Sequence, residues 1–315
     1  MRQTSLKMVH ELAKADPRVV FIGSDLGPDT LTEMRDEFPN RFFMEGISEQ
    51  NVIGMAAGMA LDGFIPYINT IATFLTRRSY EQVAVDLCLH DLPVRLIASG
   101  GGVVYAPLGP THLAIEDIAI MRALPNMTVV AVADAEEMRR LMWATLDWPH
   151  PIYIRLAKGG DPVVTSPEDG FTLGKAILKR APGDVLLVST GVMLGPCLDA
   201  ADLLEARGIT CGVLHMHTVK PIDADALVDL AGKVRLIVTV EEHILTGGLG
   251  SAVLETLSDR LPGRIPPLRR LGLPDAFPVK YGSQQEHHRL NGLTAPAIVQ
   301  AVEKAAVGAI VEAAP

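Results

Sequence analysis

The sequence predicts an α/β protein of two domains, each a mostly parallel sheet covered by helices, and three observations support this fold class. The 315 residues exceed the usual size of a single domain. Short apolar runs alternate with amphipathic helical patterns along both halves of the chain. Residues 161–172 are rich in Gly, Pro and Asp, which is typical of a linker. We therefore expect one domain at residues 1–160 and a second at residues 173–315.

The order of the elements predicts how each sheet is built. Apolar runs predict strands of the first domain at residues 18–22, 41–44, 64–68, 94–98, 128–131 and 152–156, and the segments between them have helical spacing. Strands of the second domain are expected at residues 185–188, 210–214, 234–240 and 267–271, with helices at about residues 194–207, 248–261 and 294–312. This alternation is typical of a largely parallel sheet covered on both faces. Ligands of such sheets bind at the carboxyl ends of the strands.

Composition and charge exclude several classes of function. The 28 basic and 37 acidic residues give a net charge of −9 without a dense Lys/Arg cluster, which argues against nucleic acid as a partner. Cys88, Cys197 and Cys211 are widely spaced in apolar surroundings, as expected for buried thiols in a reducing compartment. The N-terminal residues lack the apolar core of a signal peptide, and Asp62 interrupts the longest apolar stretch. We expect a cytoplasmic protein that does not enter a membrane.

Residues 46–60 place Glu49 at the head of a helix of small, otherwise uncharged residues. Such a helix packs closely on both sides, so Glu49 is expected near apolar neighbours, where burial disfavours the charged form of a carboxyl group. A protonated carboxyl there is a hydrogen-bond donor suited to a cofactor site. In the competing interpretation Ser48 is an N-cap and Glu49 is an ordinary solvated acid, favoured by the helix dipole. The segment alone leaves both open.

A long loop follows the strand predicted at residues 94–98. It begins with Ser99 and the glycines at 100–102, whose backbone freedom, together with the length of the loop, lets it cover a site. His112 lies near its end and is a candidate acid or base, because imidazole exchanges protons near neutral pH. In the alternative interpretation Thr111 caps a helix and His112 is a surface residue of its first turn.

Other motifs carry weaker signals. The turn at residues 247–250, Gly-Gly-Leu-Gly, opens a helix but lacks the G-x-G-x-x-G spacing of a dinucleotide-binding turn. The sequence contains no Walker A motif, no zinc-ligand spacing and no G-x-S-x-G nucleophile elbow. Cys211, His215 and His217 alternate along a strand and share one face, for which buried packing is favoured over metal binding. Surface or interface roles are expected for the ionisable residues at 241–243.

Two groups of motifs, taken together, resemble the transketolase family. In the first half, residues 46–51 (Gly-Ile-Ser-Glu-Gln-Asn), 109–112 (Gly-Pro-Thr-His) and 121–127 (Met-Arg-Ala-Leu-Pro-Asn-Met) look like the pyrimidine-binding domain. In the second half, residues 189–191, 214–221, 241–243 and 247–250 are similar to the C-terminal domain. The resemblance covers nearly the whole chain. It implies a thiamin diphosphate pyrimidine-binding domain followed by a transketolase C-terminal domain.

The resemblance also implies a reaction, the transfer of a two-carbon ketol unit from a ketose to an aldose with thiamin diphosphate. Glu49 matches the family glutamate that hydrogen-bonds the aminopyrimidine ring and so activates the cofactor. Phe74 matches the aromatic residue that stacks on this ring, and Asp25 matches an acid near the thiazolium ring. Without the resemblance, Phe74 would be interpreted as a core residue and Asp25 as a turn residue. The cofactor supplies the carbanion chemistry, while the protein supplies orientation and electrostatics.

For the substrate, the resemblance assigns His112 to contact with the sugar near the reacting centre. Lys158 stands where transketolases have an arginine for the substrate phosphate, and Arg155 lies nearby; both are alternatively strand-end charges. A lysine binds phosphate as a point charge without the bidentate fork of arginine. Leu108 replaces the acid that usually precedes Gly-Pro-Thr-His, and Asp29 replaces a phosphate-binding serine. We therefore expect an unusual or unphosphorylated acceptor sugar.

One part of the family's active site is missing from this sequence. In transketolases another domain holds the diphosphate and Mg²⁺ through a Gly-Asp-Gly motif, and none is found here; Gly183-Asp184 continues differently. We expect no metal ligands in this chain and a separate N-terminal transketolase subunit that binds the diphosphate and Mg²⁺. The predicted assembly is an α2β2 heterotetramer in which this chain also self-associates through both of its domains.

Two alternatives stay open. The first is the β subunit of a 2-oxoacid dehydrogenase E1 component, which has the same order of domains and resembles residues 47–50, although residues 109–112 and 122–127 favour transketolase. A synthase that joins pyruvate to a triose phosphate is a variant within the transketolase group. The second is a non-catalytic assembly subunit that kept the fold and lost the chemistry.

Overall fold

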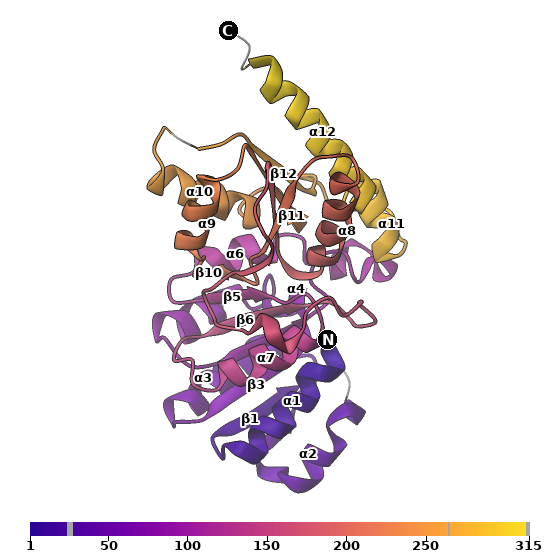
Figure 1. Ribbon diagram of the computed structural model, residues 1–315. Coiled ribbons are helices and arrows are strands. Elements are labelled where there is room, and N and C mark those ends of the chain that lie inside the picture. The colour runs from indigo at the N-terminus through magenta and orange to yellow at the C-terminus, as the bar shows by residue number, and fades with distance from the viewer. Residues whose placement is uncertain (24–27, 264, 313–315) are drawn as a thin grey trace.

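The computed structural model describes residues 1–23, 28–263 and 265–312 of the chain (Figure 1). It contains one seven-stranded and one five-stranded sheet, both mostly parallel and both covered by helices. The predicted α/β class with two such sheets is confirmed.

The first sheet contains every strand predicted in the first half of the chain, in the order β10-β5-β6-β4-β3-β1-β2. The six predicted strands pair in parallel. The seventh strand, β10, was not predicted. It comes from the second half of the sequence and pairs antiparallel with β5 at the edge of the sheet. The bounds are β1 Val19–Gly23, β2 Phe42–Met44, β3 Ile65–Ile71, β4 Arg95–Ser99, β5 Thr128–Ala131, β6 Ile152–Leu156 and β10 Thr218–Lys220.

The second sheet has the order β12-β11-β8-β9-β7. Its four predicted strands form, but β11 ends at Ile244 rather than at 240, because it carries the ionisable residues 241–243 into the interior, where they find partners. The strand β7 pairs antiparallel with β9 and was not predicted. The bounds are β7 Ile177–Arg180, β8 Val185–Ser189, β9 Cys211–His215, β11 Leu236–Ile244 and β12 Leu268–Leu273.

The helices cover both sheets (Figure 1). In the first domain α1 and α7 lie side by side on one face of the sheet, and in the second domain α8 packs against α12. A π-helical segment, Val83–Leu89, continues α5. The bounds are α1 Arg2–Ala15, α2 Thr32–Glu37, α3 Glu49–Leu61, α4 Ala72–Leu75, α5 Tyr80–Gln82, α6 Asp117–Ala123, α7 Ala135–Thr145, α8 Leu194–Glu205, α9 Ala224–Ala231, α10 Leu249–Arg260, α11 Gln284–Leu290 and α12 Ala295–Glu312.

The two domains share apolar packing through the loop that follows β4. Four of its apolar residues belong to the core cluster of the second domain: Val103, Ala106, Leu113 and Ile115. The loop is closed at its base by two hydrogen bonds, from Gly102 N to Ala114 O at 2.8 Å and from Ala114 N to Gly102 O at 3.1 Å. The second domain therefore fixes the loop that carries His112.

The three cysteines are buried free thiols, as predicted. Burial raises the pKa of Cys88 and that of Cys211 to about 12, and it raises the pKa of Cys197 further. The thiolate is the nucleophilic form of cysteine. None of these thiols is therefore prepared for catalysis.

Candidate active site

Three of the predicted site residues follow three strands of the first sheet. Glu49 begins α3, which comes after β2, and Phe74 lies in α4, directly after β3. His112 lies in the loop after β4. The carboxyl ends of parallel strands meet at one edge of the sheet, which is where such folds bind ligands.

Glu49 is buried, with 4% of its side chain exposed. Ser48 does not cap the helix with its side chain; its hydroxyl donates instead to the carbonyl oxygen of Glu45 at 2.8 Å. Arg78 Nη1 donates to Glu49 Oε2 at 2.9 Å. The predicted burial is confirmed and the solvated interpretation is wrong. The expected apolar surroundings are not what the structure shows, because the charged guanidinium of Arg78 contacts the Glu49 carboxyl group.

Arg78 and Phe74 together connect Glu49 with His112. The guanidinium carbon of Arg78 lies 3.9 Å from the centroid of the Phe74 ring, a cation–π contact. The His112 ring approaches Phe74 edge-on, with 5.5 Å between centroids. The structure therefore brings Glu49, Phe74 and His112 into one group, which we call the rim cluster together with Arg78.

Sequence reasoning missed Arg78. The available signal was the pair Arg77-Arg78, two adjacent cations a few residues after Phe74 in a segment that is otherwise uncharged from residue 63 to residue 80. The target of a long side chain depends on the tertiary fold, because its several torsion angles let it reach in many directions. The two arginines in fact serve different partners.

Arg77 braces the segment that carries His112. Its Nη2 donates to the carbonyl oxygens of Thr111 and Leu113, each at 3.2 Å, and its Nε lies 3.1 Å from Glu116 Oε1. Burial raises the pKa of Glu116, although Arg77 opposes that shift. Within the segment, the Thr111 hydroxyl lies 2.9 Å from His112 Nδ1. The imidazole is thus held from both sides of its backbone.

Arg155 is placed in the domain interface. Its side chain is 6% exposed, and its Nε donates to Asp117 Oδ2 at 2.8 Å. Its Nη2 donates to the carbonyl oxygens of Ala114 and Glu242, at 3.2 and 2.8 Å. Burial alone would lower the pKa of Arg155, but Asp117 and Glu242 raise it above its ordinary value. These contacts give Arg155 a structural role, and substrate binding by this residue stays a prediction.

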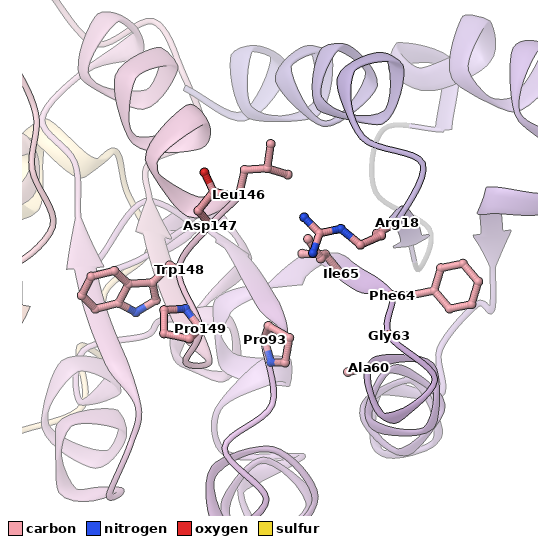
Figure 2. Close-up of a pocket in the computed structure, with 10 residues that line it drawn as sticks. All are labelled: Arg18, Ala60, Gly63, Phe64, Ile65, Pro93, Leu146, Asp147, Trp148 and Pro149. Atoms are coloured by element: carbon pink, nitrogen blue, oxygen red, sulfur yellow. The ribbon is translucent and has the colours of Figure 1, made fainter.

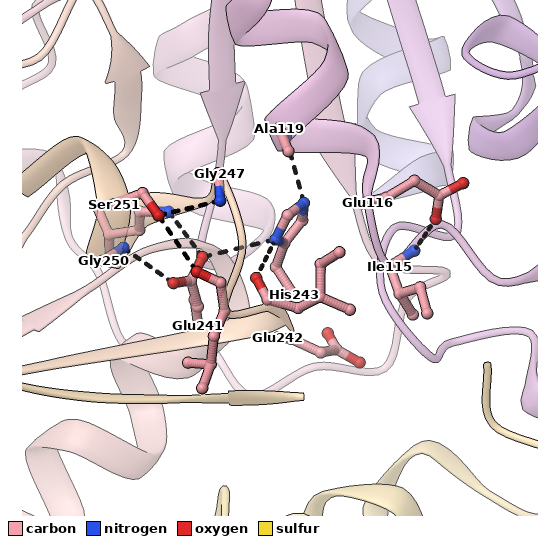
Figure 3. A network of polar contacts seen from close by, with 12 residues as sticks. Ile115, Glu116, Ala119, Glu241, Glu242, His243, Gly247, Gly250 and Ser251 are labelled. Carbon is pink, nitrogen blue, oxygen red and sulfur yellow. Dashed lines mark hydrogen bonds and ion pairs between the residues drawn. The ribbon is translucent and has the colours of Figure 1, made fainter. Parts of the chain in front are cut away.

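The glycine-rich turn at 247–250 binds an internal carboxylate (Figure 3). Leu249 N and Gly250 N, at the start of α10, donate to the two carboxyl oxygens of Glu241 at 2.7 and 2.9 Å. A Cβ at Gly248 would lie 2.0 Å from Glu241 Oε2, so only glycine allows this approach. Burial raises the pKa of Glu241 to about 7. The motif stabilises the fold of the second domain and here serves no dinucleotide.

His243 and Glu242 join the two domains beside this turn (Figure 3). His243 Nε2 accepts from Ala119 N of α6 at 3.3 Å, and burial lowers the pKa of His243 to about 4, so the ring is neutral near pH 7. Glu242 Oε1 accepts from Val103 N at 3.1 Å, at the start of the His112 loop. A Cβ at Gly102 would lie 2.5 Å from the Glu242 carboxyl carbon. A surface role for residues 241–243 is wrong, because all three are buried. Glu242 and His243 lie at the interface between the two domains, whereas Glu241 binds within the second domain.

The structure describes one of the two remaining predicted site residues, Lys158. Lys158 is exposed, just beyond the end of β6. Asp25 lies outside the described residues, as does the side chain of Asp29. Their assigned roles stay predictions.

A cavity lies at the opposite edge of the first sheet (Figure 2). It has a volume of about 380 Å³ and lies beside the starts of β1, β3 and β4, where Arg18, Ile65 and Pro93 line it. Its charged lining residues are Arg18 and Asp147, and Arg18 is already paired with Asp16. We therefore assign no chemistry to this cavity.

The buried packing predicted for His215 and His217 is confirmed. The strand β9 ends at His215, so the prediction that His217 also lies on it is wrong. His215 Nε2 lies 3.1 Å from Glu137 Oε2, and the ring of Phe171 stacks on His217 with 4.1 Å between centroids. Burial lowers the pKa of His217 to about 4. Across residues 1–23, 28–263 and 265–312, no group of three or more His, Cys, Asp or Glu side chains is arranged to hold a metal ion. In the same ranges, no helix combines the length and the apolar character needed to span a bilayer.

Comparisons with known proteins agree with this geometry. Residues 1–160 match the family model of the transketolase pyrimidine binding domain, and residues 174–298 match that of the transketolase C-terminal domain. The 6-deoxy-6-sulfo-D-fructose transketolase subunit of Clostridium sp. (strain MSTE9) is 37% identical over 96% of this chain and 94% of its own length. An apulose-4-phosphate transketolase subunit of Phocaeicola vulgatus is 36% identical over 88% of each. A solved structure described as a split gene transketolase, inactive beta4 tetramer, aligns with a TM-score of 0.89 and 39% identity, covering 96% of this chain and 97% of that one.

Proposed function

This chain belongs to the transketolase family, and we propose that it is one subunit of a split transketolase that transfers a two-carbon ketol unit from a ketose to an aldose. The single observation that supports this most is the rim cluster. Glu49, Phe74 and His112 come from three separate segments, and the fold gathers them where α/β sheets bind ligands.

The rim cluster fits the aminopyrimidine end of thiamin diphosphate. The contacts of Arg78 show which kind of group fits there. Its planar guanidinium lies over the Phe74 ring and donates a hydrogen bond to the Glu49 carboxyl group. An aminopyrimidine ring is also planar and also has nitrogens that hydrogen-bond to a carboxyl group. In the proposed function Phe74 stacks on this ring and Glu49 binds its nitrogen. When bound, thiamin diphosphate supplies the carbanion needed for ketol transfer.

The proposed work of the chain itself is to bind, orient and exchange protons. Glu49 holds a proton at the ring nitrogen, and its burial keeps competing water away. His112 contacts a sugar oxygen through Nε2, while Thr111 orients the ring by its contact with Nδ1. A positioned histidine of this kind contributes about 10² to 10⁴ in rate. Lys158, and Arg155 if a donor is free, would bind the distal end of the sugar, and Asp25 would lie near the thiazolium ring.

A partner subunit completes the proposed enzyme. The sequence contains no Gly-Asp-Gly motif, so we assign the diphosphate and Mg²⁺ to a separate N-terminal transketolase subunit in an α2β2 assembly. Two of the relatives are themselves described as subunits, and the related β4 tetramer is described as inactive. These descriptions support a requirement for a partner and self-association of the chain. We further propose that the protein acts on sugars in the cytoplasm.

Reconstitution tests this proposal. The purified chain is mixed with the diphosphate-binding subunit, thiamin diphosphate and Mg²⁺, and turnover is measured against a panel of ketoses and aldoses. We expect turnover only with both subunits, and loss of most of it in Glu49→Ala without loss of subunit association. Release of carbon dioxide from a 2-oxoacid would indicate the dehydrogenase instead. Full turnover of this chain alone, or full turnover of the Glu49→Ala complex, would overturn the proposal.

A further inference from the structure

We infer that Arg78 is an internal occupant of the aminopyrimidine site, which it fills in the absence of cofactor and must leave before cofactor binds. This inference rests on the function proposed for Glu49 and Phe74. It assigns to Arg78 a regulatory role that its neighbour Arg77 does not share.

The geometry supports this role through two simultaneous contacts. Arg78 Nη1 donates to Glu49 Oε2 at 2.9 Å, and the guanidinium carbon lies 3.9 Å from the centre of the Phe74 ring. Guanidinium is planar and delocalised, stacks on aromatic faces and hydrogen-bonds in its own plane. It therefore occupies both the stacking face and the hydrogen-bond acceptor that an aminopyrimidine ring would use. Two ligands cannot share these groups in one position.

The burial of the two partners shows which of them can move. Glu49 is 4% exposed and is fixed at the start of α3, whereas Arg78 has 41% of its side chain exposed. Its guanidinium can rotate into solvent without disturbing the core, and a half-exposed ion pair is weak because water screens it. The neighbouring Arg77 is tied to the carbonyl oxygens of Thr111 and Leu113 and to Glu116. Arg78 is therefore the displaceable member of the pair.

Displacement of Arg78 frees both the face of the Phe74 ring and the carboxyl group of Glu49. The cost of breaking the Arg78 contacts is subtracted from the affinity for the ring.

Binding of a free aminopyrimidine to the isolated chain tests the inference without any turnover. The probe is 4-amino-2,5-dimethylpyrimidine, and its dissociation constant is measured by ligand-observed NMR for wild type, Arg78→Ala and Arg78→Gln. We expect both variants to bind it about threefold to thirtyfold more tightly, the combined worth of a half-exposed ion pair and a cation–π contact. Arg139→Ala is the matched control, since it removes an exposed, paired arginine far along the sequence. Arg139→Ala should bind the probe with the same affinity as wild type.

The role proposed for Arg78 can be overturned by this measurement. Unchanged or weaker binding in both Arg78 variants overturns the inference, and so does a failure of the Arg78 variants to bind the probe at all. In that case Phe74→Ala tells whether the proposed function survives: weaker binding of the probe to Phe74→Ala than to wild type, or ketol transfer by the reconstituted pair, keeps the function and rejects the role of Arg78 alone. Thermal unfolding of each variant confirms that it is folded.

Discussion

Two arginine–carboxylate pairs of this protein have almost the same length and opposite surroundings. Arg78 and Glu49 lie 2.9 Å apart at the rim cluster, where the arginine is 41% exposed. Arg155 and Asp117 lie 2.8 Å apart in the domain interface, where the exposed fractions are 6% and 0%. A buried pair is costly to break, because either partner alone is an uncompensated charge, whereas a half-exposed pair can be exchanged for water or a ligand. The difference separates a contact that builds the fold from one that can take part in binding.

Removing Arg155 should have the largest effect on this comparison. Arg155→Met removes the cation beside the buried carboxylate of Asp117, which keeps a hydrogen bond from the Tyr153 hydroxyl at 2.7 Å. We expect a loss of about 3–5 kcal/mol in the free energy of unfolding, measured by urea denaturation. The control Arg139→Met should change it by less than about 1 kcal/mol. A loss below about 1 kcal/mol in Arg155→Met would erase the distinction between the two pairs.

The carboxylate at the rim cluster should show the reverse pattern. Glu49→Gln should lower turnover of the reconstituted enzyme by about a hundredfold or more, as expected for loss of a positioned proton-transfer group. Its free energy of unfolding should change by less than about 1 kcal/mol, because Arg78 can turn to solvent. Steady-state kinetics and urea denaturation of the same preparation measure both quantities. If Glu49→Gln keeps wild-type turnover, or is markedly destabilised, the pair of Arg78 and Glu49 has a structural role like that of Arg155 and Asp117.

A buried carboxyl group inside the second domain, Glu241, can be tested by pH. Burial raises the pKa of Glu241 to about 7 in the folded chain, from 4.5 for the ordinary group. The folded state therefore binds this proton more tightly, and wild type loses stability relative to Glu241→Gln as pH rises from about 4.5 to about 7. We expect the difference between the two proteins to shift by about 1–3 kcal/mol across that window. A pH-independent difference in urea denaturation would contradict the expectation.

The smallest expected effect is at Arg77, which belongs to neither pair. Arg77→Ala releases the carbonyl oxygens on both sides of His112 and leaves the half-buried Glu116 without its cation. We expect kcat to fall about tenfold, as positioning of His112 is lost, with a smaller change in KM. Faster proteolysis within residues 103–113 would show that the loop is loosened. Equal kcat and equal proteolysis in variant and wild type would argue that the second domain alone holds the loop.

Sequence reasoning succeeded where one local pattern determines one local structure. Each apolar run of the first half became a parallel strand, and the small-residue helix behind Glu49 buried that residue as expected. The grouping of Glu49, Phe74 and His112 was reached through a family resemblance, because no spacing in the sequence places residues 38 positions apart in contact. The ring contact of Phe74 with His112 is a property of the tertiary fold.

Each feature that the sequence did not predict has a physical reason. The strands β7 and β10 are short and lie at sheet edges, so they carry little of the apolar signal of central strands. The charged end of β11 was not predicted, because Glu241, Glu242 and His243 lower the local hydropathy and so resemble residues beyond a strand. Each of them nevertheless has a buried hydrogen-bond partner. Arg78 was missed because an arginine side chain shows no target until the fold brings one within reach.

The edge strand β10 makes the domain boundary of the sequence different from that of the fold. Residues Thr218–Lys220 follow the linker by more than forty positions, yet they complete the sheet of the first half by pairing with β5. Lys220 Nζ also donates to the carbonyl oxygen of Arg122 at 3.0 Å. A protein cut after residue 160 would expose the backbone edge of β5, a template for pairing with other chains. The two halves of the chain are therefore joined by this strand. A fusion protein or a domain exchange that uses the first half must include β10 as well.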